Sequence, residues 1–497
     1  MALPWLNPFA TGPSPAIVPW LFTLTCVAAC MMLLADASRD LLAKVTAWAW
    51  LAAALISACI GLLQYFGVAA LFSPWVNGTG PGEAFANLRQ RNQFATLTNM
   101  GLASLIWVLT RWPMQPTRIT SVAGLAAAAL LAIGNAASSS RTGLVQLILL
   151  IALFALWGGL RLANVRRILY VAALAYVAGS VVLPLLAGLD PASTGILARL
   201  QDGGPACGSR LILWRNVLHL ITLRPWLGWG WGELDYAHFT TLYEGPRFCE
   251  ILDNAHNLPL HLAVELGVPA ALLICGAGLW LAWRAKPWRE QDATRQMAWS
   301  VLAVILLHSL LEYPLWYGPF QMAFIVCVLL LRQQSQHAVG PTYKNRRMPL
   351  RPIIKAWTAT ILIAIVAFAA WDYHRVSQIF LAPDSRSPAY RDNTMAKIRG
   401  SWLFSSQVRF AEFVTTPLTR DNAAHVNAMA HQLLHYSPEA RVAEKLIESA
   451  VLLGRDDEAL HYLVRYRAAF PAEYARWAKK QDAGLSNQTG AAQSGAR

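Results

Sequence analysis

The sequence predicts an all-α, polytopic membrane protein, and three observations lead to this fold class. Of the 497 residues, 56% are hydrophobic and 14% are charged, whereas a soluble domain has about 45–50% apolar and about 25% charged residues. The mean hydropathy is +0.38. The apolar residues also form long blocks, and a transmembrane helix needs about 17–25 such residues. Amino-acid composition alone therefore excludes an ordinary soluble domain.

Ten apolar blocks have the length of a transmembrane helix or come close to it. The predicted spans are residues 16–35, 41–65, 93–110, 118–134, 143–158, 168–188, 258–283, 297–311, 315–331 and 353–371. The N-terminus has no basic segment, and no A-x-A-like site follows the first block, so we expect no cleavable signal peptide.

Basic residues alternate between successive loops, and this alternation predicts the topology. Seventeen Lys and Arg residues lie in 36–44, 111–118, 159–167, 284–296 and 332–355, against eight in the intervening loops. The positive-inside rule places the first set in the cytoplasm and the others outside, together with the C-terminus. The net charge of +14 is therefore not a basic soluble face, and no nucleic-acid partner is expected. Residues 1–15 fall outside and suit a turn between two spans, which leaves open a span upstream of residue 1.

The chain is expected to have three parts. Residues 1–371 form the transmembrane domain, which contains one large outer loop at 189–259. Residues 372–480 form a soluble helical domain, in which 438–471 has the period of about 34 residues typical of a tetratricopeptide (TPR) helix pair. Residues 481–497 are small and polar and are predicted to be a disordered tail.

Charged side chains are rare in the predicted spans, where each costs about 2.5–3.5 kcal/mol at the membrane centre. Glu265 is the clear exception, and Glu312 lies at a boundary. Arginines dominate the outer loops, which the positive-inside rule disfavours, so they are expected to bind an anionic ligand. They are Arg89, Arg91, Arg141, Arg199, Arg210, Arg215, Arg224 and Arg247. The alternative for any one of them is pairing with loop acids, such as Asp190, Asp202, Glu233 and Asp235.

The segment from Asp253 to Pro259, DNAHNLP, has the features of a helix start. Asp253 or Asn254 can cap the helix, and Pro259 is tolerated in the first turn. His256 is then placed where the positive end of the helix dipole favours a neutral imidazole, the form that a general base requires. The alternative is that His256 only makes a hydrogen bond at the helix end.

No metal or cofactor is expected. His308 and Glu312 are four residues apart and could share a helix face, but no third ligand is near in sequence, so a helix-end hydrogen bond is favoured over a metal site. The glycines of Gly228–Gly232 lack the G-x-G-x-x-G spacing of a nucleotide loop and suggest a tight turn at the membrane surface.

The seven cysteines include no CxxC pair. Five lie in predicted spans, where a thiol behaves as a small apolar group. Only Cys207 and Cys249 lie in the large outer loop, and an oxidising compartment favours a disulfide between them. It would close a loop of about 43 residues and stabilise the fold by about 3–4 kcal/mol. The alternative is two free thiols.

Several blocks resemble a known superfamily. The segment DNAHNLPLHLAVELGVPAALL (253–273) resembles the core motif of the O-antigen ligase/polymerase superfamily, of the Wzy and WaaL type. SSSRTGLVQL (138–147) and GSRLILWRNVLHLITLRPWLGWGWGEL (208–234) are similar to two further blocks of it.

Three other blocks resemble, more narrowly, the PglL/PilO-type protein O-oligosaccharyltransferases. They are LPWLNPFATGPSP (3–15), ANLRQRNQFATLTNMGL (86–102) and LHSLLEYPLWYGPF (307–320). The resemblance covers about residues 3–330, and a soluble tail after the last span also fits that subfamily.

The resemblance implies a GT-C-like membrane glycosyltransferase of the bacterial inner membrane, with its active site and C-terminus facing the periplasm. It implies inverting, metal-independent transfer of a glycan from undecaprenyl diphosphate to a hydroxyl group. Arg141 and Arg210 match the diphosphate-binding arginines, Arg89, Arg91 and Arg215 are further candidates, and His256 matches the base. Supporting roles are expected for Asp253, Asn257, Glu265, His308 and Glu312.

Three functions compete. The first is transfer to Ser/Thr hydroxyls of periplasmic proteins, possibly pilins, with a lipid-linked glycan, an acceptor protein and membrane lipid as partners. The second is ligation of O-antigen to lipid A-core, or its polymerisation, which uses the same chemistry on another acceptor. The third is a non-enzymatic transporter or scaffold. A transporter is expected to show paired broken helices and polar midplane residues, which these spans do not clearly show.

Overall fold

The computed structural model describes residues 1–481 except 35–36, 112–117, 191–193, 202–206 and 333–349. Asp202 and residues 482–497 therefore lie outside the described residues. The described part is helical and contains no strand, which confirms the all-α class. It divides into two compact units: residues 1–203 with 279–371, here called the membrane unit, and residues 204–278 with 372–497, here called the loop–tail unit. The sequence had grouped 204–278 with the transmembrane domain.

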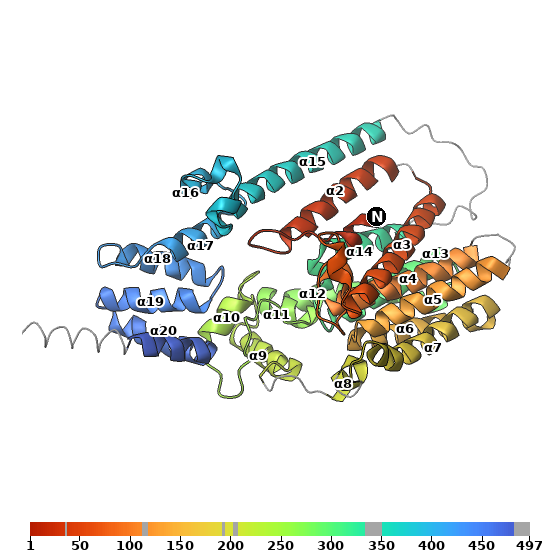
Figure 1. Cartoon of the computed structure of the whole chain (residues 1–497), viewed down its shortest axis with the longest axis horizontal. Coiled ribbons are helices and arrows are strands. Elements are labelled where there is room, and N and C mark those ends of the chain that lie inside the picture. Colours follow the sequence, from red (N-terminus) through yellow and green to blue (C-terminus); the bar gives the residue numbers. More distant parts are fainter. Residues whose placement is uncertain (35–36, 112–117, 191–193, 202–206, 333–349, 482–497) are drawn as a thin grey trace, which may run out of the picture. The chain divides into compact units, whose positions relative to one another are not determined.

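The membrane unit is a bundle of apolar helices (Figure 1). Its α-helices are α1 (Leu3–Leu6), α2 (Ile17–Leu34), α3 (Arg39–Tyr65), α4 (Arg91–Arg111), α5 (Arg118–Ala137), α6 (Arg141–Leu156), α7 (Ala163–Leu186), α8 (Gly195–Gln201), α13 (Ala293–Ser309) and α14 (Gly318–Arg332). Short 3-10 helices are η1 (Ala69–Phe72), η2 (Ala86–Leu88), η3 (Gly159–Arg161), η4 (Pro287–Arg289) and η5 (Pro314–Trp316). Two further helices, α12 (Val268–Ala285) and α15 (Leu350–Ser377), contain the boundaries between the two units.

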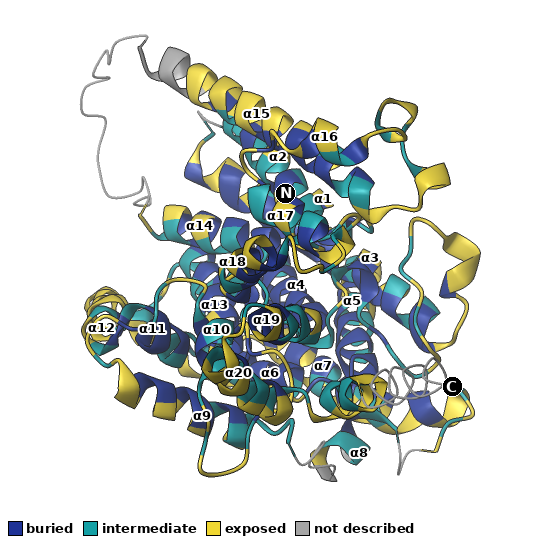
Figure 2. Ribbon diagram, turned by 90° about the vertical axis from the view of Figure 1, so that its left-hand side faces the viewer, coloured by how far each residue is buried: buried dark blue, intermediate teal, exposed yellow. Residues whose placement is uncertain are grey.

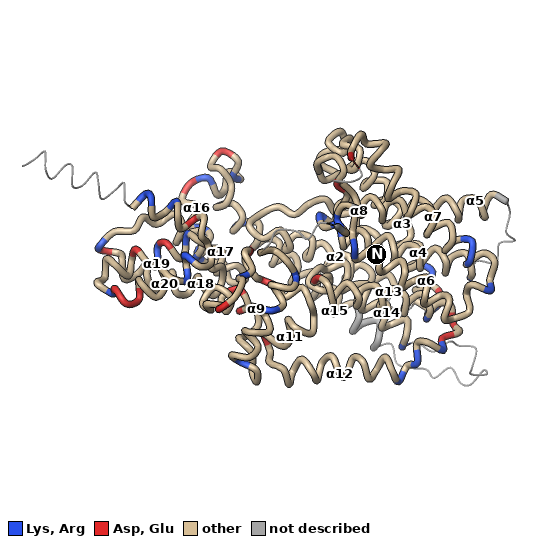
Figure 3. The backbone as a smooth tube through the Cα atoms, turned by 90° about the horizontal axis from the view of Figure 1, so that it is seen from below, with Lys and Arg blue, Asp and Glu red and all other residues tan. Residues whose placement is uncertain are grey.

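Helix α4 forms the centre of the bundle, and its side chains from Gln93 to Val108 are buried (Figure 2). Close packing depends on small residues, because apolar helices in lipid gain most from backbone approach. A Cβ added to Gly101 would lie within 3.0 Å of Ala54 on α3. Lys and Arg lie at helix ends, leaving the middle stretches uncharged (Figure 3).

Six helical stretches are long and apolar enough to cross a membrane. They are Ile17–Leu34, Arg39–Tyr65, Ile119–Ala137, Ala163–Leu186, Val268–Arg289 and Ala356–Phe380, and two shorter apolar helices are Arg141–Leu156 and Gly318–Arg332. The protein is therefore a multi-pass membrane protein, whereas the full number of ten spans and their orientation stay predictions.

The predicted span 258–283 is wrong as a single helix. It is broken at Gly267 into α11 (Leu258–Leu266) and α12. The chain closes the break with another segment: the amides of Trp229 and Gly230 donate to the carbonyls of Val264 and Glu265, at 2.9 and 3.0 Å. The glycine-rich segment thus satisfies carbonyl groups at the end of α11.

The loop–tail unit contains α9 (Arg210–Leu223), α10 (Leu234–Thr240), α11 and five tail helices. The tail helices are α16 (Thr394–Ile398), α17 (Ser405–Thr415), α18 (Ala423–Leu434), α19 (Ala440–Leu452) and α20 (Asp456–Ala469), preceded by η7 (Gln378–Phe380), η8 (Pro383–Ser385) and η9 (Pro388–Tyr390). Helices α19 and α20 occupy the stretch where the sequence predicted a helix pair.

Helix α10 is packed into the hydrophobic core of the tail. Phe239 is 2% exposed and belongs to the same apolar cluster as residues of α17 to α20. Tyr236 stacks on His435 with ring centroids 3.8 Å apart, and His435 contacts Glu233 at 2.7 Å. The Arg465 guanidinium donates to the Thr240 carbonyl at 2.7 Å. The tail and the segment before His256 therefore form one folded body.

Candidate functional site

The residues expected to act together lie in both units. Arg89, Arg91, Arg141, His308 and Glu312 belong to the membrane unit, and Arg210, Arg215, Asp253, His256, Asn257 and Glu265 belong to the loop–tail unit. Each group is described within its own unit.

The backbone around His256 is fixed by local hydrogen bonds. His256 has φ 49°, a left-handed conformation that few non-glycine residues adopt. Its amide donates to Asn254 Oδ1 at 2.9 Å, and the neighbouring Ala255 carbonyl accepts from Trp214 Nε1 at 3.1 Å. Backbone strain of this kind is retained where the surroundings hold it, and it recurs at functional sites.

The helix cap differs from the expected one. Asn257 caps α11, because its Oδ1 accepts from the Leu260 amide at 3.1 Å, and neither Asp253 nor Asn254 does so. The buried Asn254 instead holds the turn that carries His256. His256 is therefore one residue before the cap and two residues before the first turn of α11.

Helix α11 buries an acid beside a second histidine. Glu265 and His261 are four residues apart, 1% and 2% exposed, and their Oε2 and Nε2 atoms are 3.4 Å apart. Sequence reasoning had noted Glu265 but missed His261, although the i, i+4 spacing was visible.

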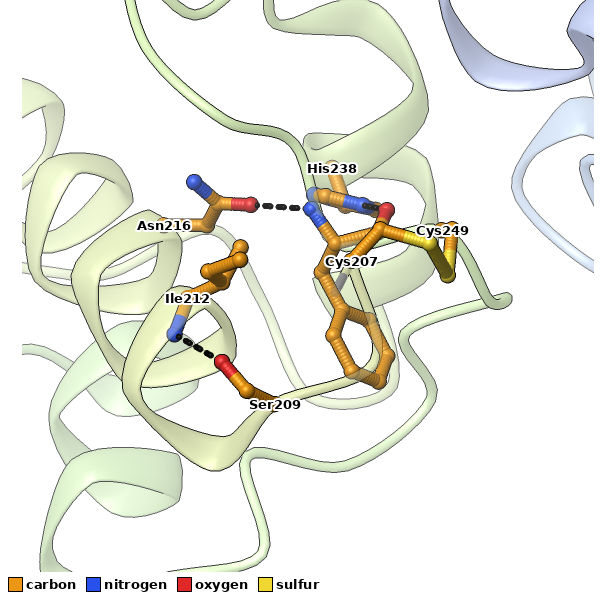
Figure 4. Close-up of a disulfide and its surroundings, with 7 residues drawn as sticks. Cys207, Ser209, Ile212, Asn216, His238 and Cys249 are labelled. Carbon is orange, nitrogen blue, oxygen red and sulfur yellow. Dashed lines mark hydrogen bonds between the residues drawn. A yellow bond between two sulfur atoms is a disulfide. The ribbon is translucent and has the colours of Figure 1, made fainter. Parts of the chain in front are cut away.

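Arg210 and Arg215 are presented by α9, whose start is fixed by the disulfide (Figure 4). Cys207 and Cys249, the pair expected to be bonded, form a disulfide with Cα atoms 5.4 Å apart. Asn216, one residue after Arg215, accepts from the Phe248 amide at 2.8 Å. Helix α9 is thus tied at two points to the chain that leads to His256.

A buried histidine, His238, also contacts the segment that is bonded to α9. His238 Nδ1 lies 2.8 Å from the Tyr243 hydroxyl. Its Nε2 lies 3.1 Å from the Phe248 carbonyl (Figure 4). Burial, and then the nearby Arg247 charge, lower the pKa of His238 to about 3, so its ring is neutral at physiological pH. Burial raises the pKa of Asp235 to about 7, and the charges of Glu233 and Asp253 add to the shift.

Several outer arginines have partners within the protein. Arg247 donates to the carbonyls of Thr241 and His238 at 2.9 and 2.7 Å. Arg224 stacks on Trp229, 4.2 Å from the ring centroid, and Arg199 donates to the Ser139 carbonyl at 3.2 Å. Arg91 is paired with Glu83. Each of these four arginines therefore has a structural contact within the protein, and the partner of Arg91 is a carboxylate.

In the membrane unit, a buried polar network adjoins Arg141. Arg141 is exposed and begins α6, which Ser140 caps. The Ser140 hydroxyl donates to Asn92 at 2.6 Å, and Asn92 in turn donates to Glu312 at 3.4 Å. Thr96 contacts His308 Nδ1 at 2.9 Å. The structure therefore places the Arg141 helix start, His308 and Glu312 in one region.

The remaining candidate of this group, Arg89, contacts the Pro8 carbonyl and has φ 60°. Asn92 and Thr96 were missed from the sequence, because polar residues on a membrane helix do not reveal which neighbours they face. Among the described residues, no group of three or more His, Cys, Asp or Glu side chains could hold a metal ion.

The apolar bundle defines a multi-pass membrane protein, and its candidate arginines and histidines include Arg141, Arg210, His256 and His308, each at or near the end of a helix. Three family models match successive parts of the chain: "Protein glycosylation ligase" at 84–109, "O-Antigen ligase" at 126–275 and "Virulence factor membrane-bound polymerase, C-terminal" at 296–483. These matches confirm the resemblance seen in the sequence. In three successive parts, the chain is therefore similar to proteins of the O-antigen ligase and PglL type.

Two curated relatives from Acinetobacter baylyi (strain ATCC 33305 / BD413 / ADP1) are similar to the chain. A "General O-oligosaccharyltransferase" is 22% identical over 69% of this chain and 59% of its own length. A "ComP-specific O-oligosaccharyltransferase" is 26% identical over 61% of this chain and 53% of its own length. The chain thus spans between about half and three fifths of these relatives. No solved structure matches it.

Proposed function

We propose that the protein transfers an oligosaccharide from undecaprenyl diphosphate to Ser or Thr hydroxyls of periplasmic proteins, at the outer face of a bacterial inner membrane. The observation that carries this proposal is the fixed turn of His256 at the start of α11, inside the segment similar to O-antigen ligases. The names of both relatives support the reaction class.

The chemistry needs a base and a stabiliser of the leaving group. His256 accepts the proton of the acceptor hydroxyl as its oxygen bonds to the anomeric carbon. The bond from that carbon to the diphosphate oxygen breaks, and undecaprenyl diphosphate leaves with the electron pair. Attack opposite the leaving group inverts the anomeric configuration, and no metal is required.

Arginines suit the leaving group, because a guanidinium binds phosphate oxygens through two parallel hydrogen bonds. Arg141 and Arg210 are the main candidates, with Arg215 and Arg89 as further ones. Arg91 is the weakest of this group, because Glu83 already pairs with it.

The competing function is ligation of O-antigen to lipid A-core, or its polymerisation, and two of the family descriptions favour it. Deleting the gene and comparing periplasmic glycoproteins with lipopolysaccharide from the same cells separates the two. Loss of protein glycans with unchanged lipopolysaccharide is expected. Loss of O-antigen alone would replace the proposal by the ligase function, and no change in either would argue for a transporter or scaffold.

A further inference from the structure

A cavity of about 550 Å³ lies between α3, α4, α5 and α7 in the membrane unit. Its volume is within the range of about 300–1,000 Å³ that is typical of small-molecule sites. The walls are mostly apolar and include Leu51 and Leu55 of α3, Val108 of α4, Ala127 of α5 and Ile168 of α7. Neighbouring helices in the bundle therefore leave room for an apolar ligand.

Small residues on α5 create this space. Ala123, Gly124 and Ala127 line it where larger side chains would close it. A Cβ on Gly124 would already lie 2.8 Å from Leu109 of α4. Because α5 is otherwise packed closely against α7, the gap is local.

The cavity has a polar end. Thr120 and Ser121 in the first turn of α5, and Asn164 and Arg167 in the first two turns of α7, contribute to its lining. The Arg167 side chain is exposed and forms no salt bridge with a carboxylate of the described residues. A positive charge therefore stands beside an apolar chamber at the end of the bundle where α5 and α7 begin.

Three of the helices that line the cavity are apolar enough to cross a membrane. Helices α3, α5 and α7 are candidate membrane spans, and only 39% of the apolar stretch in each of the last two is buried. Trp48, a lining residue, is 44% exposed. A basic pocket between membrane helices is the arrangement that binds anionic lipid headgroups.

We propose that this cavity binds a phospholipid with an anionic headgroup, with an acyl chain against the apolar walls and the headgroup phosphate at Arg167. The site is distinct from the region of Arg141. Thr120 and Ala137 are 17 residues apart on α5, about 25 Å along a helix, and Arg141 follows the far end. The lipid is therefore a structural partner of the bundle, separate from the proposed glycan donor.

Native mass spectrometry of the full-length, delipidated protein in detergent tests this assignment. Dioleoyl-phosphatidylglycerol and dioleoyl-phosphatidylethanolamine are added in parallel. Wild type should retain the anionic lipid preferentially, and Arg167→Gln should weaken its binding about tenfold, as expected for one lost charge-assisted contact. Arg166→Gln is the matched control, because Arg166 is adjacent and exposed but does not line the cavity.

A second variant tests the apolar chamber. Ala127→Leu fills the cavity and leaves Arg167 in place, so binding of both lipids should fall. Equal retention of the two lipids by wild type would overturn the headgroup assignment. If Arg166→Gln weakened binding of the anionic lipid as much as Arg167→Gln does, the preference would reflect surface charge and not the cavity. Displacement of phosphatidylglycerol by undecaprenyl phosphate at equal concentration would assign the cavity to the donor lipid instead.

Discussion

Replacing Gly267 by alanine probes the break between α11 and α12. Gly267 has φ 88° and ψ 159°, a region that is essentially restricted to glycine and costs another residue about 1–3 kcal/mol. The new Cβ would also lie within 3.0 Å of the Trp226 carbonyl oxygen and the Leu227 amide nitrogen. Both are backbone atoms, so the clash is relieved only if the whole segment from Pro225 to Gly230 moves.

Movement of that segment breaks the hydrogen bonds from Trp229 to Val264, from Gly230 to Glu265 and from Val268 to Pro225, of 2.9, 3.0 and 2.8 Å. Each contributes about 0.5–1.5 kcal/mol net. The protein either keeps the bonds and bears strain of about 1–3 kcal/mol, or loses three bonds at a cost of about 1.5–4.5 kcal/mol, so the variant should be destabilised by at least about 1 kcal/mol.

The assay is the melting temperature of the purified protein in detergent, combined with hydrogen exchange at the amides of Trp229 and Gly230. Gly276→Ala is the control, because Gly276 lies within α12 and a Cβ there meets nothing within 4 Å. We expect Gly267→Ala to melt earlier and to lose protection at both amides. Melting and protection equal to those of Gly276→Ala would refute the reasoning.

Three further predictions concern the site. His256→Ala should reduce glycan transfer about 10²–10⁴-fold without loss of expression, whereas the exposed His425→Ala should not, and residual transfer above about a tenth of wild type would exclude a general base. Lys at Arg141 or Arg210 should restore only part of the activity lost in the Ala variants, because the two-pronged contact is missing; full restoration would indicate simple positive charge. Because the pKa of Asp235 is raised from 3.8 to about 7, the stability it contributes is present below pH 3.8 and lost as the pH rises towards 7. Asp235→Asn should therefore flatten the melting temperature between about pH 4 and 7, and an unchanged slope would contradict the assignment.

Apolar block length was sufficient to locate the long helices, because a helix in lipid satisfies its own backbone and needs no distant partner. The disulfide could also be predicted from the sequence, since Cys207 and Cys249 are the two cysteines outside the predicted spans. Both inferences rest on local composition.

The break at Gly267 was missed because it depends on the segment around Gly228, which lies some forty residues earlier in the chain. The hydrophobic residues of the predicted span 258–283 continue through the break, so hydrophobic periodicity does not reveal it. The partners of Arg91 and Arg247 lie only six to nine residues away in the sequence. Charge counting nevertheless could not assign them, because only the folded loops show that Glu83 and backbone carbonyls bind these arginines.

The packing of α10 into the tail limits how these proteins can be recombined. Phe239 supplies part of the tail's core, and Arg465 of the tail bonds the end of α10. A chimera that exchanges only residues after 372 for those of a relative would leave Phe239 and Glu233 facing a foreign surface. A transplanted tail must therefore carry the 233–240 segment with it, and in homologous enzymes these two stretches are expected to change together during evolution.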